Sequence, residues 1–218
     1  MPSYYPVYLN LKGRRCVIIG GGAEAERKVN GLLECGAQVT VISPKATIAL
    51  QDLANRGLID WVSREYQTGD LEGVFLAIAE NDKPMVYMEV AREAERRGVL
   101  LNVVDTTNLC SFIAPAIVRR GDVTFAISTS GLSPALARRL KEELSESPVL
   151  RWADMADMVA EVRLALQRKG VRPDPERWQE CMDEELLELF HGGRREEAKE
   201  RLLHMLQEQP RSTQEIRA

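Results

Sequence analysis

The chain has 218 residues, of which 44% are hydrophobic and 28% charged, with a formal net charge of -4 at pH 7. Acidic and basic residues balance over residues 1–144, which argues against a general basic surface for nucleic acid, and no apolar run is long enough to cross a bilayer. The four cysteines form no CxxC pair and the first residues lack the pattern of a signal peptide, so we expect a cytoplasmic protein without a disulfide framework or a zinc site.

Residues 16–42 have the pattern of a βαβ unit. The apolar, β-branched run at 16–19 predicts a buried parallel strand, and a helix is expected to about Cys35, where Gly36 would end it. Residues 39–42 predict the next strand.

The turn between the first strand and the helix carries a GxGxxA motif formed by Gly20, Gly22 and Ala25. Gly20 permits a tight turn, Gly22 lets the backbone approach a pyrophosphate, and Ala25 keeps the helix close to the sheet. Free N–H groups at the helix start would bind the anion. We therefore predict a dinucleotide site; the alternative is a glycine turn that serves packing alone.

Ser43, Pro44 and Lys45 follow the second strand, where an NAD-binding fold often carries an acidic residue that bonds to the ribose. Ser43 can still bond to a hydroxyl group, and Lys45 could tolerate a 2′-phosphate. The residues alone leave NAD and NADP both open.

The alternation of strands and helices continues to residue 104. A helix, a glycine stop and a short strand are expected over 52–66, a buried strand over 74–78, a helix over 84–97 and a strand over 99–104. This alternation predicts a parallel sheet with helices on both faces, and ligands of such sheets bind beyond the carboxyl ends of the strands. The residues expected at that edge are Gly20, Ser43, Ala79 and Asp105.

The pattern changes after residue 110. Two strands joined by a tight turn at 120–122 predict a hairpin, and a polar turn then precedes a helix with Ser133 as its cap and Pro134 at its first position. Such a turn ahead of a helix is a second place where an anion could bind. Three further helices are expected, over 147–170, 176–193 and 194–209. The first carries a methionine-bearing face that is typical of core or of a dimer contact.

Three stretches together, GGGAEAERKVNGLLECGAQVTVISP, FLAIAEND and NVVD…SFIAPAIVRRGDVTFAISTSGLSPALARRLKEEL, resemble precorrin-2 dehydrogenase, the dehydrogenase module of siroheme synthase. The resemblance implies NAD-dependent oxidation of precorrin-2 to sirohydrochlorin by a homodimer whose central hairpin and helices come from both subunits. It also implies that the C-terminal helices help to cover the substrate cleft, so a lid is the alternative to a packing role for the methionine-bearing face. Some family members also insert Fe2+ into the product; no residues of this sequence have convincing metal-ligand spacing, so no metal site is predicted.

The expected fold class is α/β. A Rossmann-type parallel sheet over residues 1–113 binds NAD, a small α+β dimerisation hairpin and helix spans 114–146, and a helical domain spans 147–218.

The resemblance also implies the site residues. The pyrophosphate is expected on Gly20, Gly21, Gly22, Ala23 and Glu24, the adenosine ribose near Ser43, Pro44 and Lys45, and the other half of the cofactor near Ala79, Asn81 and Val104. The residues expected to meet the substrate are Ser128, Thr129, Ser130, Gly131, Arg119 and Arg138. Thr129 stands where some relatives carry a serine that can be phosphorylated.

Asp105 matches the active-site aspartate of the family. A carboxylate beside the cofactor could take the proton that the oxidation releases, or its charge could orient the macrocycle through the pyrrole N–H groups. The structural alternative is that Asp105 only caps the following turn or bonds to Thr107. Arg119, Arg120, Arg138, Arg139 and Lys141 are the basic residues available for the carboxylates of the substrate, although a basic helix face is usually just solvated.

Two other functions compete with this one. A non-catalytic NAD(H)-sensing regulatory domain would bind the cofactor without turnover, and would leave the NVVD segment and the basic helix without a role. A different small-molecule dehydrogenase is the third possibility, but four residues after Tyr87 the sequence has Ala91 in place of the lysine of the Tyr-x-x-x-Lys pair of short-chain alcohol oxidation.

Overall fold

The computed structural model describes residues 4–80 and 84–208. Contacts within the chain divide it into two compact units. The first comprises the residues up to Ala114 together with Ser128–Ser133, and the second comprises Pro115–Ile127 and the residues from Pro134 onward. The loop Ser128–Ser133 thus packs with the first unit although its neighbours on both sides belong to the second. This grouping differs from the three-part division expected from the sequence, which stays a prediction.

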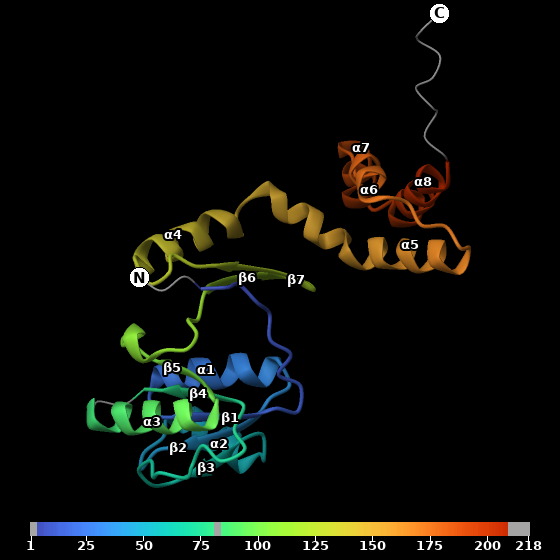
Figure 1. The fold of residues 1–218 in the computed structure, drawn as a ribbon. Coiled ribbons are helices and arrows are strands. Elements are labelled where there is room, and N and C mark those ends of the chain that lie inside the picture. The colour runs from blue at the N-terminus through green and yellow to red at the C-terminus, as the bar shows by residue number, and fades with distance from the viewer. Residues whose placement is uncertain (1–3, 81–83, 209–218) are drawn as a thin grey trace, which may run out of the picture. The chain divides into compact units, whose positions relative to one another are not determined.

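The first unit is built on a five-stranded parallel sheet with the order β3-β2-β1-β4-β5 (Figure 1). The strands are β1 (Arg15–Ile19), β2 (Gln38–Ile42), β3 (Asp60–Val62), β4 (Leu76–Ala79) and β5 (Leu100–Val103). The helices are α1 (Ala23–Glu34), α2 (Ile48–Asn55) and α3 (Pro84–Arg97), and a short 3-10 helix, η1 (Thr107–Leu109), follows β5. The expected Rossmann-type α/β fold is therefore confirmed.

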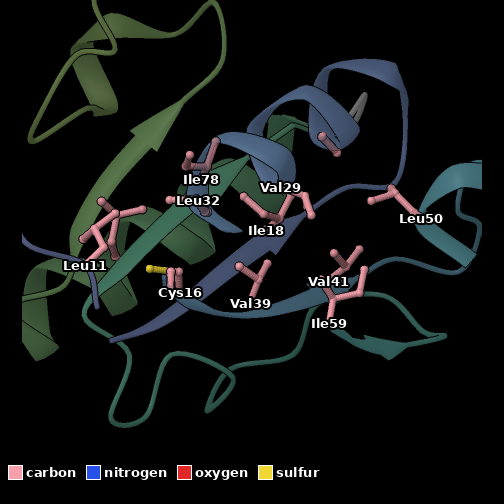
Figure 2. Close-up of a cluster of buried hydrophobic side chains, with 13 residues drawn as sticks. Leu11, Cys16, Ile18, Val29, Leu32, Val39, Val41, Leu50, Ile59 and Ile78 are labelled. Carbon is pink, nitrogen blue, oxygen red and sulfur yellow. The ribbon is translucent and has the colours of Figure 1, made fainter. Parts of the chain in front are cut away.

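Both faces of this sheet are covered, which explains why the inner strands β1 and β4 are almost continuously apolar. Alternate residues of β1 face opposite sides: Ile18 packs in one cluster with Val29 of α1 and Leu50 of α2 (Figure 2). Val17 packs in another cluster with Val90 of α3. Gly36, with a φ of +72°, ends α1 as the sequence predicts.

The second unit contains an antiparallel hairpin of β6 (Ala116–Arg120) and β7 (Val123–Ile127), joined at Gly121 and Asp122 as expected. Its helices are α4 (Pro134–Ser145), the 3-10 helix η2 (Pro148–Met155), α5 (Ala156–Arg168), α6 (Pro175–Cys181), α7 (Glu184–His191) and α8 (Arg195–Gln207). Met155, Met158 and Val162 are buried in the core that these helices form, so the methionine-bearing face is core.

Two helix predictions in this unit were wrong in detail. The segment 147–170 begins as the 3-10 helix η2 and becomes α-helical only at Ala156. The segment 176–193 is two helices, because the side chain of Asp183 accepts a hydrogen bond from the N–H of Leu186 at 2.9 Å and starts α7 inside the expected helix. In the described part of the chain, no helix combines the length and the apolar character that a membrane span requires.

Candidate functional site

An open pocket of about 500 Å³ lies at the carboxyl ends of the strands of the first unit. The chain leaves β1 toward β2 on one side and reaches β4 on the other, so the strand order reverses at β1, and this is the place where parallel sheets bind ligands. The pocket is lined by Gly20, Gly21, Gly22, Ser43, Pro44, Lys45, Ala46, Thr47, Glu65 and Glu80. Six of the residues expected to hold the cofactor are among these.

The remaining expected cofactor residues are placed differently. Ala23 and Glu24 form the first turn of α1, and Ala79 is buried at the end of β4. The N–H of Val104 donates to the carbonyl of Ala79 at 2.9 Å, which ties the end of β5 to the end of β4. Asn81 lies outside the described residues.

The glycines let neighbouring segments approach the end of β1 closely. A Cβ atom on Gly20, whose φ is +138°, would lie 2.1 Å from the carbonyl oxygen of Glu80. A Cβ atom on Gly21 would lie 2.0 Å from the carbonyl oxygen of Lys45. Gly21 is not one of the three motif positions, yet the structure demands glycine there as strongly as at Gly20. Motif reasoning alone does not show this, because the constraint comes from the loop after β2.

The loop after β2 is held against the glycine turn by hydrogen bonds. The N–H of Thr47 donates to the carbonyl of Gly21 at 3.0 Å. The hydroxyl of Ser43 is buried and donates to the carbonyl of Lys45 at 2.7 Å, and the indole N–H of Trp61 donates to the carbonyl of Ser43 at 3.0 Å. The Lys45 side chain is exposed and is the one cation among the pocket-lining residues.

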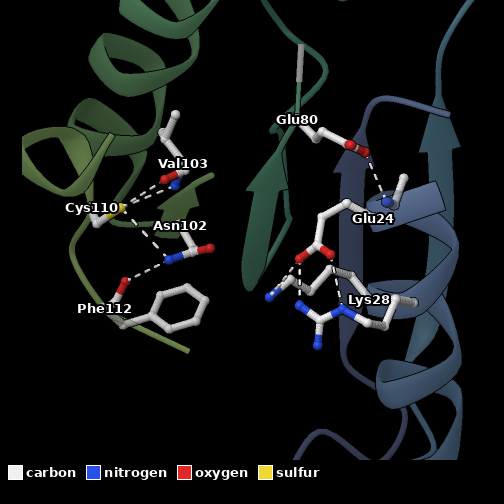
Figure 3. Close-up of polar contacts among 9 residues, drawn as sticks. Glu24, Lys28, Glu80, Asn102, Val103, Cys110 and Phe112 are labelled. Atoms are coloured by element: carbon white, nitrogen blue, oxygen red, sulfur yellow. Dashed lines mark hydrogen bonds and ion pairs between the residues drawn. The ribbon is translucent and has the colours of Figure 1, made fainter. Parts of the chain in front are cut away.

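The start of α1 offers backbone N–H groups to the pocket. Gly22 is the N-cap and has no side chain to bond to them, and the first intrahelical bond runs from the N–H of Glu26 to the carbonyl of Gly22. The Oε2 atom of Glu80 accepts a hydrogen bond from the N–H of Ala25 at 2.8 Å (Figure 3). Sequence reasoning gave Glu80 no role; its position directly after β4 was the available signal.

Glu24 is neutralised by its neighbours on α1. The Nε atom of Arg27 donates to Glu24 at 2.9 Å, and Lys28 lies 3.3 Å from the same carboxylate (Figure 3). The hydrogen bond from Arg27 is the main reason that the pKa of Glu24 lies below its ordinary value. The carboxylate of Glu24 is thus paired within α1, and we expect only its backbone N–H to bond to a ligand in the pocket.

Asp105 follows the end of β5, the strand that pairs with β4, and it does not line the pocket. Its φ is +57°, in the left-handed region, and its side chain is exposed. The carboxylate forms no hydrogen bond or ion pair with any described residue, and the turn is closed instead by the N–H of Thr106, which donates to the carbonyl of Val103 at 3.2 Å. The structure therefore shows neither the cap nor the bond to Thr107 that the structural alternative requires.

The segment 110–112 runs back beside β5 and supports this loop. The Sγ atom of Cys110 accepts a hydrogen bond from the N–H of Val103 at 3.1 Å, and the amide of Asn102 donates to the carbonyl of Phe112 at 3.1 Å (Figure 3). Burial raises the pKa of the Cys110 thiol. Sequence reasoning missed this contribution of Cys110, because a single cysteine has no spacing signal.

The loop Ser128–Ser133 lies against the residues that follow Asp105. A Cβ atom on Gly131 would lie 3.6 Å from Cγ2 of Thr107. Ser130 has a φ of +54°, and it and Asp105 are the two non-glycine residues with positive φ in the described ranges. Strain of this kind concentrates at functional sites, and here it falls on two loops of the same unit that meet.

The other expected substrate residues of this loop are engaged within it. The Oγ atom of Ser128 accepts a hydrogen bond from the N–H of Ser130 at 3.0 Å. The hydroxyl of Thr129 accepts from the N–H of Ser133 at 3.2 Å and donates to its carbonyl at 3.1 Å, so it closes the turn before α4.

The basic residues expected near the substrate belong to the second unit. Arg120 forms a two-bond ion pair with Asp154, at 2.6 and 2.7 Å, and Arg139 pairs with Glu143. Arg138 is exposed and has no ion-pair partner in the described ranges, whereas Arg119 has an interaction of its own. No group of three or more His, Cys, Asp or Glu side chains that could hold a metal ion occurs among the described residues.

Residues 7–116 match a family model described as putative NAD(P)-binding, and residues 120–147 match one described as sirohaem biosynthesis protein central. The chain is 39% identical over 203 residues to siroheme synthase of Methylococcus capsulatus, covering 92% of this chain and 43% of that protein. It is 35% identical over 207 residues to siroheme synthase of Photobacterium profundum, covering 94% and 44%. The chain thus spans less than half the length of these curated relatives.

A solved structure titled SirC, precorrin-2 dehydrogenase, matches the fold with a TM-score of 0.70 at 27% sequence identity. The match covers 93% of this chain and 98% of that one, so it includes both compact units.

Proposed function

We propose that this chain, which belongs to the family described as putative NAD(P)-binding, oxidises precorrin-2 to sirohydrochlorin with a nicotinamide dinucleotide in siroheme biosynthesis. The observation that carries the proposal is Asp105, whose backbone φ is positive and whose carboxylate has no bonding partner among the described residues. It stands at the strand end beside a glycine-turn pocket, in a chain that matches a precorrin-2 dehydrogenase over almost its whole length.

The pocket residues suit the pyrophosphate and the adenosine part of the cofactor. The N–H groups at the start of α1 would hold the pyrophosphate, and the loop of Ser43 and Lys45 would hold the adenosine ribose. When bound, the oxidised nicotinamide supplies the chemistry by accepting a hydride. We place the nicotinamide toward the paired ends of β4 and β5.

The dehydrogenation removes two hydrogens from the macrocycle, one as a hydride and one as a proton. The carboxylate of Asp105 follows the end of β5 and has no bonding partner within the described chain, so we assign the proton to it. The alternative role is to orient the ring by accepting hydrogen bonds from pyrrole N–H groups. Ser130 and Gly131, on the loop packed beside Thr107, would border the same substrate.

A homodimer is part of this proposal. Helix α4 is amphipathic, yet none of its side chains is buried. Leu140 of α4 remains 44% exposed and Ile117 of β6 remains 42% exposed. A two-stranded sheet with one wet apolar face is marginal alone, and a second copy that covers α4 and the hairpin would supply the missing contacts.

A cytoplasmic location is also proposed. All four cysteines are free thiols, as is typical of proteins in a reducing compartment.

The function is tested by mixing the purified chain anaerobically with precorrin-2 and NAD+, then following NADH and the spectrum of sirohydrochlorin. Formation of both is the expected result, and repeating the assay with NADP+ decides the cofactor. Addition of Fe2+ after the reaction tests whether the chain also inserts iron, in which case the siroheme spectrum develops. Cofactor binding without turnover, where a control dehydrogenase works, would favour the NAD(H)-sensing alternative.

A further inference from the structure

The carboxylate of Glu80 occupies a backbone N–H group at the start of α1, where the dinucleotide pyrophosphate is expected to bind. We propose that Glu80 is an internal competitor of the cofactor phosphate: it caps α1 and must turn away when the dinucleotide binds, and thereby weakens binding and favours release. This inference rests on the proposed function, because it requires that the pocket takes a dinucleotide.

The backbone of Glu80 is fixed while its side chain can turn. Its N–H donates to the carbonyl of Ile19 at 2.7 Å, and its own carbonyl oxygen lies so close to Gly20 that a Cβ there would be 2.1 Å away. These contacts anchor the end of β4 to the end of β1. The glutamate side chain has three rotatable bonds beyond this anchor and is only partly buried, so its carboxylate can leave α1 without moving the strand.

The carboxylate lies over the glycine turn itself. A Cβ atom on Gly22 would be 3.4 and 3.5 Å from the two carboxylate oxygens of Glu80. The Gly22 N-cap has no side chain that could serve as a cap, and the acceptor for the Ala25 N–H comes instead from a residue 55 positions away. The glycine that would let a phosphate approach the helix therefore admits the carboxylate of Glu80.

The carboxylate of Glu80 and the pyrophosphate of the cofactor are both negative and would compete for the N–H groups at the start of α1. Glu80 forms no ion pair with any described cation, and Glu65 is a second carboxylate in the pocket lining. The pyrophosphate of a dinucleotide carries further negative charge, and like charges at hydrogen-bond range repel. Binding at the same N–H groups must therefore displace Glu80, whereas binding beside it must overcome the repulsion.

The test compares dissociation constants of NAD+ and of inorganic pyrophosphate, by calorimetry, for the wild-type chain and three variants. Glu80→Gln keeps an acceptor for the Ala25 N–H and loses the charge, Glu80→Ala loses both, and Glu65→Gln removes the other pocket carboxylate as a matched control. We expect both ligands to bind about tenfold more tightly to the two Glu80 variants, the scale of one charge-assisted hydrogen bond. The control should change affinity much less.

A second readout follows the competition directly. The backbone amide signal of Ala25 should shift on addition of NAD+ in the wild-type chain, and should start from a different position in Glu80→Ala.

An equal gain in affinity for Glu65→Gln would overturn the inference, since the gain would then come from the general negative charge of the pocket. Unchanged binding by Glu80→Gln would also overturn the inference. Weaker binding by this variant would overturn it too, because it would mean that Glu80 bonds to the cofactor. In each of these outcomes the proposed cofactor site still stands if the wild-type chain binds NAD+. If neither the wild-type chain nor any variant binds NAD+, both the proposed cofactor site and the inference about Glu80 are overturned.

Discussion

Asp105 combines an unfavourable backbone conformation with a carboxylate that has no hydrogen bond or ion pair among the described residues. Left-handed φ values cost a non-glycine residue about 1 kcal/mol, somewhat less for aspartate and asparagine. The loop holds this conformation through contacts on either side, with the thiol of Cys110 bonded to Val103 and the Ser128–Ser133 loop against Thr107. Backbone strain at a residue whose side chain has no bonding partner among the described residues is typical of functional sites.

Replacing Asp105 with asparagine should separate binding from chemistry. Asparagine tolerates the left-handed backbone, so the loop and the affinity for NAD+ should be unchanged, while loss of the carboxylate should lower turnover of precorrin-2 by about 100-fold or more. The dissociation constant and the initial rate of NADH formation measure the two effects. Asp105→Gly serves as a control for strain and should be as stable as the wild type. Wild-type turnover by Asp105→Asn would contradict a role in proton transfer.

Gly21 offers a second test at the scale of one residue. Gly21→Ala would place a Cβ atom 2.0 Å from the carbonyl oxygen of Lys45, so the loop after β2 must move and NAD+ should bind at least about tenfold more weakly. Gly31→Ala, in the interior of α1 with no atom within 4 Å of the new Cβ, should instead stabilise the protein by about 0.5–1 kcal/mol. Equal affinities of the two variants for NAD+ would refute the close approach.

Among the elements, α3 is fixed to the loop before β4 by one buried carboxylate. Glu93 is fully buried, accepts hydrogen bonds from the hydroxyl of Tyr66 and from the N–H of Gly69, and pairs with Arg97 at 2.6 Å. Burial alone would raise the pKa of Glu93, but these hydrogen bonds together lower it below its ordinary value. The charged carboxylate is thus the form that the fold prefers.

The sign of the pH effect follows from this lowered pKa. A carboxylate whose pKa is lower in the folded state adds stability above its unfolded pKa, and that stability is lost as the pH falls through the folded value. Glu93→Gln should therefore lower the free energy of unfolding by about 2 kcal/mol at neutral pH, with a smaller loss in acid, as urea titrations at several pH values would measure. Glu95→Gln, exposed on the same helix, is the control. A loss that does not depend on pH would contradict the assignment.

The elements also show what sequence reasoning can and cannot reach. The inner strands β1 and β4 were predicted because their burial on both faces makes each an almost continuous apolar run, and glycines such as Gly36 marked the helix ends. The break at Asp183 was missed because a cap inside an apolar pattern looks like any exposed acidic residue. Glu80 and the Ser128–Ser133 loop gained their roles from contacts with residues far away in the chain, which no local pattern contains.

At the scale of the whole molecule, the exposed apolar side chains of the second unit predict self-association. Leu140→Glu on α4 should weaken a homodimer by at least about tenfold, because a charge would be buried in its interface. Sedimentation velocity over a concentration series measures this. Leu58→Glu, at a similarly exposed leucine of the first unit, should leave the association unchanged. A wild-type chain that stays monomeric at all concentrations would contradict the proposed dimer.

The ratio of NADH formed to precorrin-2 consumed tests the central claim most directly. Under anaerobic conditions, with the purified chain and excess NAD+, we expect one NADH and one sirohydrochlorin for each precorrin-2 consumed. NAD+ that binds with no NADH formed, under conditions in which a control dehydrogenase turns over, would contradict it.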